Sequence, residues 1–524
     1  MHLLAKILAA LAATALLAAC DNNRSADNPT PEQPGQSEPP PPPTRGSLIV
    51  SPPERLASYT PDQLLAAVQA GSAAGKLLEF IVDPACTVDV HYLRYNTVDP
   101  VDAPTTASGA LMVPNGADPA CQGGRPILLY AHGAVIERSF NIANITDPAS
   151  AEGLLVALAF AARGYIVVAP NYAGFDASTL DYHPYLHAAQ QANDAVDALI
   201  AARSALPTRF APTVTDVGKL FLTGYSQGGF VAMATHRLLQ ERGDPVTASA
   251  PMSGPYALGA FGDAVFYGQV IGSAPLLVSW LLTSYQRAYG NVYATPADAF
   301  DARYAPGIEE LLPAAGSRSD IYDQGLLPRE QLFSSTPPAP AYAPYTPAAS
   351  PPDLAHVFAR GFGPEALILN SYRLAYLQDA ELRPDGGFPN VTDGRPAEAP
   401  QNGLRAAFVA NDLRNWAPNA PVLMCGGVDD PTVLYLNTDL MQQYWSANAA
   451  PGPVEVLDVD GDPALDDSYF EIKAGFATAK EAVELSAVAN GATDGGAAAV
   501  AEAYHTALVA PFCLAATVSF FNKY

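Results

Sequence analysis

Residues 219–229 read KLFLTGYSQGG, and this stretch decides the fold of the chain. Its first half, residues 219–223, has the apolar composition of a buried strand, and residues 230–240 behind it have helical spacing. The pattern Gly-x-Ser-x-Gly arises by chance in many chains, but between a strand and a helix it is typical of a strained turn that presents a nucleophilic serine. Only glycine avoids clashes on either side of such a turn. We therefore predict that Ser226 is a nucleophile, with a structural Gly-Ser turn as the alternative.

The sequence around this turn alternates between apolar runs and helical stretches. The apolar runs are residues 126–131, 165–169 and 219–223, and the helical stretches between them are residues 151–162 and 184–204. Such an alternation predicts a parallel sheet of the α/β class with helices on both faces. Upstream, residues 88–94 and 108–113 alternate apolar and polar side chains, which predicts an antiparallel edge to the sheet.

A nucleophilic serine needs a general base, and histidine is the usual one. In folds that carry this turn, the chain order is serine, acid, histidine. His505 is the only histidine after His356, which lies in the part of the chain that we predict to be a cap. Elimination and order therefore predict that His505 is the base. Two alternatives are that His132, which precedes the serine, is the base, and that His505 is a surface residue of a terminal helix.

The acid should follow another buried strand between the serine and the histidine. Residues 421–424 have the composition of that strand. The residues behind it fit the pattern Gly-x-x-Asp-x-x-Val, which runs from Gly427 to Val433 and selects Asp430. Asp429 is the second candidate. We expect the other carboxylate to be solvated or hydrogen-bonded to N–H groups of the loop.

Negative charge that develops on a substrate carbonyl oxygen needs hydrogen-bond donors. The first buried strand ends in His132, Gly133 and Ala134, and the serine turn continues into Gln227. We predict that the backbone N–H groups of Ala134 and Gln227 form this oxyanion hole. His132 is then a turn residue.

The N-terminal residues 1–20 read MHLLAKILAALAATALLAAC and have the positive charge, apolar run and small residues of an export signal. Their last four residues resemble a bacterial lipobox, which implies acylation of Cys20; a plain cleavage site is the alternative. Residues 21–53 are rich in proline and predict a disordered linker. We therefore expect an exported bacterial lipoprotein on the periplasmic or cell-surface side of a membrane, held there by an N-terminal lipid anchor.

The chain is strongly acidic, because 27 Lys and Arg stand against 52 Asp and Glu for a formal net charge of −25. This excess argues against nucleic acid as a partner. Asp458, Asp460 and Asp462 resemble the start of a calcium loop, but Pro463 and Tyr469 replace the glycine and glutamate that such a loop needs. We therefore predict no metal site.

Four cysteines follow Cys20, and an exported protein would oxidise them to disulfides. Four cysteines allow three different pairings. The pairs that we favour are Cys86–Cys121 and Cys425–Cys513. The first two cysteines are near each other in sequence. The second two flank the predicted acid and base, so a contact between those residues would bring them to the same corner.

Four short motifs occur together along the chain. They are residues 171–175 (NYAGF), 183–186 (HPYL), 224–229 (GYSQGG) and 250–256 (APMSGPY). Together they resemble the capped α/β-hydrolases of the lipase A type, a group of secretory lipases and related bacterial carboxylesterases. The likeness covers about residues 85–260 and 415–520. It implies a Ser–Asp–His triad, no cofactor and carboxylic ester substrates.

Two segments depart from that family. Residues 458–504 separate the last predicted strand from the histidine and predict an alanine-rich helical insertion. Residues 257–419 carry no family motif, and we predict a large helical cap there. Within it, residues 264–286 are uncharged and long enough to span a membrane. Ser226 and Asp430 lie on either side of this segment and must meet, so we predict paired apolar helices over the site instead.

The predicted organisation is an α/β-hydrolase fold with a mostly parallel central sheet and a cap inserted after the nucleophile strand–helix unit. Its parts are a signal peptide (1–20), a linker (21–53), the N-terminal core (54–256), the cap (257–419) and the C-terminal core (420–524). This organisation predicts hydrolysis of esters with an apolar acyl or aryl group, such as lipids or polyesters, through an acyl-enzyme. A serine peptidase of the same fold and a catalytically inactive surface-anchored binding module are the alternatives. The sequence predicts no oligomeric state.

Overall fold

The computed structural model describes residues 43–71, 83–147, 150–210, 212–387, 389 and 394–524. The chain divides into two units, Met1–Pro42 and Pro43–Tyr524, and the second unit contains the fold. The predicted signal peptide, the lipidation site Cys20 and most of the predicted linker lie outside the described residues. Export and lipid anchoring therefore stay predictions.

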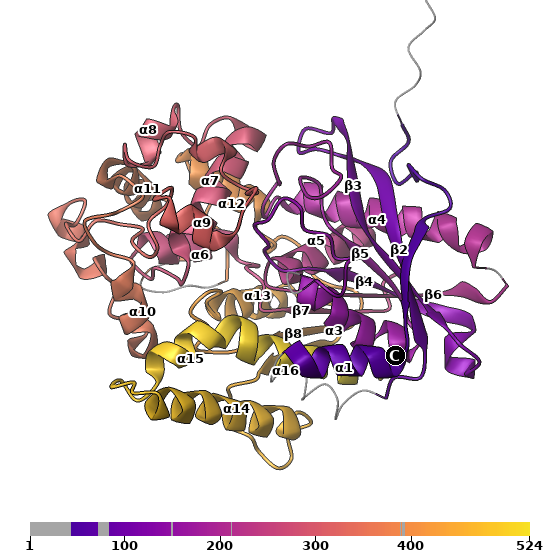
Figure 1. Ribbon diagram of the computed structural model, residues 1–524. Helices are drawn as coiled ribbons and strands as arrows, with labels where there is room; N and C mark the ends of the chain where they lie inside the picture. The colour runs from indigo at the N-terminus through magenta and orange to yellow at the C-terminus, as the bar shows by residue number, and fades with distance from the viewer. Residues whose placement is uncertain (1–42, 72–82, 148–149, 211, 388, 390–393) are drawn as a thin grey trace, which may run out of the picture. The chain divides into compact units, whose positions relative to one another are not determined.

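A nine-stranded sheet runs through the folded unit in the order β1-β2-β3-β5-β4-β6-β7-β8-β9 (Figure 1). The strands are β1 (Glu54–Tyr59), β2 (Thr87–Val98), β3 (Pro104–Asn115), β4 (Gly123–Ala131), β5 (Ile166–Pro170), β6 (Val214–Tyr225), β7 (Ala248–Met252), β8 (Val422–Gly426) and β9 (Val454–Asp458). Neighbours from β1 to β5 pair antiparallel, and all pairs from β5 to β9 are parallel. Strands β5, β7 and β8 are buried along their whole length because both faces of the parallel part are covered.

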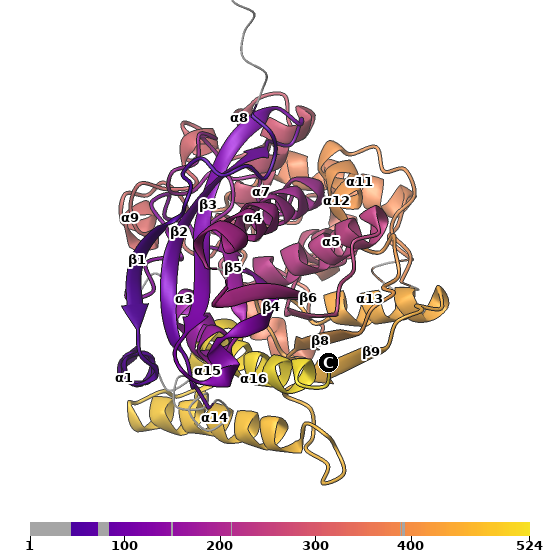
Figure 2. The same ribbon diagram turned by 90° about the vertical axis from the view of Figure 1, so that its right-hand side faces the viewer.

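Helices cover both faces of the sheet, as Figure 2 shows. One face carries α4 (Ala188–Arg209), α5 (Gln227–Arg242) and α13 (Leu436–Ala447), and the other carries α3 (Ala151–Ala159), α16 (Ala510–Phe521) and, packed on α3, α1 (Pro61–Gly71). A mostly parallel sheet with helices on both faces and a serine turn after β6 is the α/β-hydrolase fold. The predicted fold class is confirmed.

Between β7 and β8 the chain leaves the sheet and forms a helical cap (Figure 1). Its helices are α6 (Leu258–Phe266), α7 (Ala274–Tyr289), α8 (Pro296–Ala299), α9 (Arg318–Asp323), α10 (Ala355–Arg360), α11 (Asn370–Leu382) and α12 (Gly403–Asn411). The uncharged segment 264–286 is broken between α6 and α7, where Gly268 has a φ of 97°. The 16 residues of α7 are too few to cross a bilayer.

Two arginines with almost no exposed surface connect helices of the cap through buried ion pairs. Arg405 pairs with Asp263 and Asp379, and Arg414 pairs with Asp385 and Asp412, at N–O distances of 2.7 or 2.8 Å. Asp412 also accepts a hydrogen bond from the backbone N–H of Gly259 in α6. Buried charges persist only when they are paired and hydrogen-bonded, so these networks hold α6, α11 and α12 in one arrangement.

Residues 43–53, which the sequence analysis assigned to the linker, contact the sheet. The backbone N–H of Gly46 donates to the carbonyl of Asn96 (2.8 Å), and that of Ile49 donates to the carbonyl of Arg94 (2.9 Å). The folded unit therefore begins before residue 53. The short apolar stretch in this segment is surrounded by prolines, which is why composition alone assigned it to the linker.

The chain ends in one long apolar helical run, Ala497–Phe521. It consists of α15 (Ala497–Ala503), a π-helical turn (Tyr504–Val509) and α16, and the predicted insertion also contributes α14 (Phe470–Ala489), which packs alongside. Among the described residues, this run alone has the length and composition of a membrane span, but 78% of its apolar window is buried inside the folded unit. It is a core helix that packs on β6, β7 and β8.

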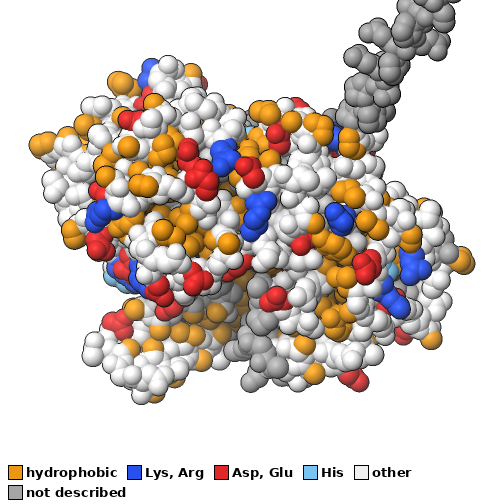
Figure 3. Space-filling model, turned by 45° about the horizontal axis from the view of Figure 1, so that its top comes forward, with side chains coloured by type: hydrophobic (Ala, Val, Ile, Leu, Met, Phe, Trp, Pro, Cys, Tyr) orange, Lys and Arg blue, Asp and Glu red, His pale blue; other side chains and the backbone are white. Residues whose placement is uncertain are grey.

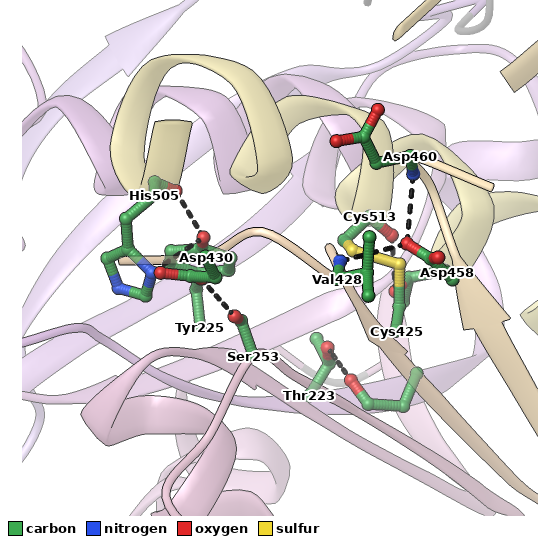
Figure 4. The surroundings of a disulfide bond; sticks show 12 residues. Thr223, Tyr225, Ser253, Cys425, Val428, Asp430, Asp458, Asp460, His505 and Cys513 are labelled. Carbon is green, nitrogen blue, oxygen red and sulfur yellow. Dashed lines mark hydrogen bonds and ion pairs between the residues drawn. A yellow bond between two sulfur atoms is a disulfide. The ribbon is translucent and has the colours of Figure 1, made fainter. Parts of the chain in front are cut away.

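The structure contains the two disulfides favoured by the sequence, Cys86–Cys121 and Cys425–Cys513, with Cα–Cα distances of 5.5 and 5.6 Å. The second bridge joins the end of β8 to α16. It therefore connects the loop that carries the predicted acid to the helical run that carries the predicted base (Figure 4).

Replacing both Cys425 and Cys513 with alanine is expected to lower the free energy of unfolding by about 2–5 kcal/mol. This bridge spans 88 residues of sequence, against 35 for Cys86–Cys121. Because the longer closure restricts the unfolded chain more, the matched variant without Cys86 and Cys121 should lose about 1 kcal/mol less. Thermal unfolding of both variants measures the losses, and a smaller loss for the 425–513 variant would contradict the expectation.

Candidate active site

Ser226 occupies a sharp turn between β6 and α5. Its backbone has φ 57° and ψ −120°, a conformation that costs a residue with a side chain on the order of 1–3 kcal/mol. Glycine is required on both sides of this serine. A Cβ at Gly224 would lie 2.4 Å from the carbonyl oxygen of Ala131, and a Cβ at Gly228 would lie 1.9 Å from the same oxygen. The Gly-x-Ser-x-Gly sequence thus matches a strained strand-to-helix turn.

His505 and Asp430 meet beyond the end of β8 (Figure 4). His505 Nδ1 lies 2.6 Å from Asp430 Oδ2, and both side chains are buried. The same oxygen accepts a hydrogen bond from the Ser253 hydroxyl (2.8 Å). Asp430 Oδ1 accepts from the backbone N–H groups of Thr432 (2.9 Å) and Val433 (3.0 Å). Four contacts therefore fix the orientation of this carboxylate, and one of them is to the histidine.

His505 lies on the π-helical turn of the C-terminal helical run rather than on a loop. Single π-helical turns inside α-helices are frequent at functional sites. The hydroxyl of Tyr225 donates to the backbone carbonyl of His505 and lies 3.3 Å from its Nδ1. Because Tyr225 precedes Ser226 in the chain, this contact connects the turn that carries Ser226 directly to His505.

Ser226 and His505 line the same cavity, which has a volume of about 560 Å³. Apolar side chains from α6 and α7 form much of its wall: Leu258, Phe261, Val265, Phe266, Leu277, Val278 and Leu281. Exposed charged residues also line it, namely Arg318, Arg329, Glu330, Arg360 and Glu502. His505 Nε2 is buried and has no hydrogen-bond partner among the described residues. Figure 3 shows the exterior of the cap on the left, where apolar side chains lie among charged ones of both signs.

The two predicted oxyanion donors, Ala134 and Gln227, line this cavity beside Ser226. Gln227 is the first residue of α5, so its backbone N–H has no acceptor within the helix. Within the part of the chain that the structure describes, neither this N–H nor that of Ala134 donates a hydrogen bond. Two backbone donors next to the serine are therefore open to a substrate oxygen.

Two further histidines lie near the site, and their ring nitrogens already contact other polar groups. His132 Nδ1 lies 2.7 Å from the carbonyl oxygen of Gly133 and its Nε2 lies 3.2 Å from that of Asn171, while burial lowers the pKa of His132 to about 4. His183 Nε2 lies 2.7 Å from Gln227 Nε2, and burial lowers the pKa of His183 to about 3. Neither ring is placed to accept a proton from Ser226.

Asp429, the second candidate for the acid, belongs to a different network. Its backbone N–H donates to the hydroxyl of Tyr504 (3.1 Å), which in turn donates to Asp460 Oδ2 (2.7 Å). Lys480 Nζ lies 2.6 Å from the same oxygen of Asp460 and 3.7 Å from Asp429 Oδ2. Since Lys480 is on α14, the helical insertion of the C-terminal core holds the loop that carries Asp429 and Asp430. Sequence reasoning had no signal for this role of Tyr504.

Replacing Tyr504 with phenylalanine is expected to lower kcat about 3- to 10-fold with KM unchanged. The variant leaves the N–H of Asp429 without its acceptor, which costs about 1–3 kcal/mol and loosens the loop next to Asp430. Steady-state kinetics and the melting temperature measure both effects. The matched control is Tyr444→Phe, because the Tyr444 hydroxyl has no hydrogen-bond partner in the described ranges. Equal behaviour of the two variants would show that the network does not position the loop.

Among the residues that the structure describes, no three His, Cys, Asp or Glu side chains are grouped to hold a metal ion. Asp458, which resembles the start of a calcium loop in sequence, accepts hydrogen bonds from the backbone N–H groups of Val428 (3.1 Å) and Asp460 (3.0 Å) (Figure 4). It stabilises the turn after β9.

No protein-family model matches the sequence, and no curated protein matches it. Several solved structures are similar to this chain. The rice cell wall degrading esterase LipA from Xanthomonas oryzae is 28% identical, with a TM-score of 0.62 over 79% of this chain and 91% of that chain. A putative hydrolase from Legionella pneumophila is 18% identical, with a TM-score of 0.60 over 90% of this chain and 96% of that chain. This second likeness supports the fold and not the activity.

Candida antarctica lipase A is a more distant structural neighbour, at 12% identity and a TM-score of 0.44 over 79% of this chain and 76% of that chain. The likeness to LipA confirms the resemblance to capped α/β-hydrolases that the motifs indicated. The chain is a hydrolase of the esterase or lipase type.

Proposed function

We propose that this hydrolase is a serine carboxylic ester hydrolase in which Ser226 is the nucleophile, His505 the general base and Asp430 the residue that orients the imidazole. The observation that carries the proposal is the buried 2.6 Å contact between His505 Nδ1 and Asp430 Oδ2 at the wall of the cavity that Ser226 also lines. With Nδ1 bonded to a carboxylate, Nε2 is the nitrogen left to accept a proton. The likeness to an esterase supports the same class of reaction.

The arrangement supports two half-reactions. In the first, Ser226 Oγ bonds to the carbonyl carbon of the ester while its proton passes to His505 Nε2; the C–O bond to the alcohol then breaks, and the alcohol leaves with that proton. In the second, water attacks the acyl-enzyme, gives a proton to Nε2 and releases the carboxylic acid, and the proton returns to Ser226 Oγ. Asp430 stabilises the imidazolium that forms in each half.

The N–H groups of Ala134 and Gln227 serve as the oxyanion hole in this proposal. Donors that are already in place when negative charge develops are worth about 2.7–4 kcal/mol each to the transition state. The N-terminus of α5 adds the positive end of a helix dipole at the same point. This support comes from backbone groups, so it is insensitive to side-chain identity at both positions.

The wall of the cavity supports esters with an apolar acyl or aryl group as the substrates. Aliphatic and aromatic side chains of α6 and α7 remove such a group from water, whereas the charged residues at the cavity, apart from Glu152, are exposed. Burial of each additional CH2 group contributes about 0.8 kcal/mol. Longer acyl chains should therefore bind more tightly until the cavity of about 560 Å³ is full.

Hydrolysis of p-nitrophenyl esters from acetate to palmitate tests this function. We expect kcat/KM to rise by up to about 4-fold for each added CH2 group and then to level off or fall. A fluorophosphonate probe should label the protein at Ser226 only, as located by mass spectrometry of the digested protein. Absence of hydrolysis for every ester, with the protein folded, would contradict the proposal.

The same measurements separate the two alternatives. A serine peptidase would take the probe at Ser226 but prefer peptide substrates over esters in a panel that contains both. A binding module without activity would neither take the probe nor hydrolyse any ester. The presence of Ser226 and His505 at one cavity, with Asp430 bonded to the histidine, favours the esterase over the inactive module.

A further inference from the structure

Besides the exposed Glu330 and Glu502, the cavity has a third carboxylate that the triad does not use. Glu152, in the first turn of α3, lines the cavity together with Ser226 and His505. The backbone N–H of Gly133 donates to this carboxylate and lies 3.1 Å from both of its oxygens. The hydroxyl of Tyr130 donates to Oε2 at 2.6 Å. Glu152 is therefore bound to the strand and the turn that lead into the predicted oxyanion hole.

The carboxylate also lies close to the nucleophile. A Cβ at Gly133 would be 2.9 Å from Glu152 Oε1, 3.4 Å from the carbonyl oxygen of Tyr225 and 3.8 Å from Ser226 Cβ. Gly133 is thus enclosed by the glutamate on one side and the serine turn on the other. A side chain at position 133 would displace the Glu152 carboxylate, whereas its contacts with the serine turn would be ordinary ones.

A carboxylate next to an oxyanion hole needs an explanation, because its negative charge opposes the charge that develops there. Removal from bulk water raises the pKa of Glu152. Burial of its carboxylate costs free energy, which the hydrogen bonds that it accepts must offset. Those bonds occupy the N–H of Gly133, so this N–H is unavailable to substrate. The next N–H along the chain, that of Ala134, is the one left open to the cavity.

We propose that Glu152 is a positioning residue of the oxyanion hole. By accepting the N–H of Gly133 it fixes the turn of residues 132–134, and Tyr130 fixes the carboxylate in turn. The N–H of Ala134 then faces the substrate oxygen before the reaction starts. Donors that are held in advance stabilise a transition state more than donors that must reorganise. This inference rests on the proposed ester hydrolysis at Ser226.

Kinetics of Glu152→Ala, with the best ester of the series as substrate, test the inference. We expect kcat to fall about 10- to 100-fold while KM stays within about 2-fold, because the lost interaction acts in the transition state. A trifluoromethyl ketone with the same acyl chain forms a hemiketal oxyanion on the serine, so its inhibition constant should rise by the same factor as kcat/KM falls. Glu152→Gln keeps an oxygen that accepts from Gly133 and should recover most of the activity.

Two further variants serve as controls. Glu471→Ala removes a glutamate from the first turn of α14 that does not line the cavity, and should leave kcat unchanged. Glu152→Asp withdraws the carboxylate by one methylene and replaces the alanine variant if that does not fold; it should lower kcat at constant KM. The inference would be overturned if Glu152→Ala left both kcat and the inhibition constant unchanged. Glu152→Asp is judged by the same criterion where it replaces the alanine variant. Equal losses of kcat in the alanine and glutamine variants would also overturn it. Full activity of Ser226→Ala would instead overturn the proposed function itself.

Discussion

Replacing Ser226 with alanine is expected to lower kcat for ester hydrolysis by about 10⁴-fold or more, to a rate set by the oxyanion hole and binding alone. The variant loses the only atom that forms the acyl-enzyme. It keeps the backbone of the turn, because alanine and serine are equally strained at φ 57°. The fold should therefore survive, and the melting temperature should stay close to that of the unmodified protein.

The measurement is steady-state hydrolysis of the best p-nitrophenyl ester, followed by labelling with the fluorophosphonate probe. Ser204→Ala is the matched control, since Ser204 is an exposed serine on α4 that contacts only its own helix. We expect that control to retain full activity and probe labelling. Substantial hydrolysis by the folded Ser226→Ala variant would mean that another group is the nucleophile.

The parallel half of the fold was predictable because its signals are local. A buried parallel strand is a continuous apolar run, and the serine turn needs glycine where a Cβ would clash with Ala131. Strand β7 has no such signal, since its sequence ASAPM is short and includes a proline. The C-terminal helix is ambiguous in sequence for a different reason. Its apolar composition matches a core helix and a membrane span equally well, and only packing on the sheet separates them.

The site shows the same division. The strand–turn–helix motif predicts Ser226 and chain order predicts His505, because both are properties of the sequence. The contacts of Tyr504 and Glu152 depend on residues 19 to 75 positions away and have no local pattern. The choice between Asp429 and Asp430 also depends on tertiary structure, because neighbouring residues of a loop point in different directions.

Asp430→Asn is expected to lower kcat by about 10⁴-fold, whereas Asp429→Asn should change it by less than about 3-fold. The two substitutions are chemically identical and lie one residue apart, so each controls for the other. Asp429 loses only a 3.7 Å pairing with Lys480 that is partly exposed to solvent. Both variants should remain folded, and steady-state kinetics on one ester measure the difference.

The large effect of Asp430→Asn follows from the orientation that the amide must adopt. Two backbone N–H groups, of Thr432 and Val433, point at Oδ1, so the asparagine oxygen has to stay there and its NH2 group has to face His505. That NH2 group donates to Nδ1, which moves the ring proton to Nε2 and leaves no acceptor for the proton of Ser226. If the Asp429→Asn variant were the inactive one, the hydrogen bond between His505 and Asp430 could not be the one that orients the base.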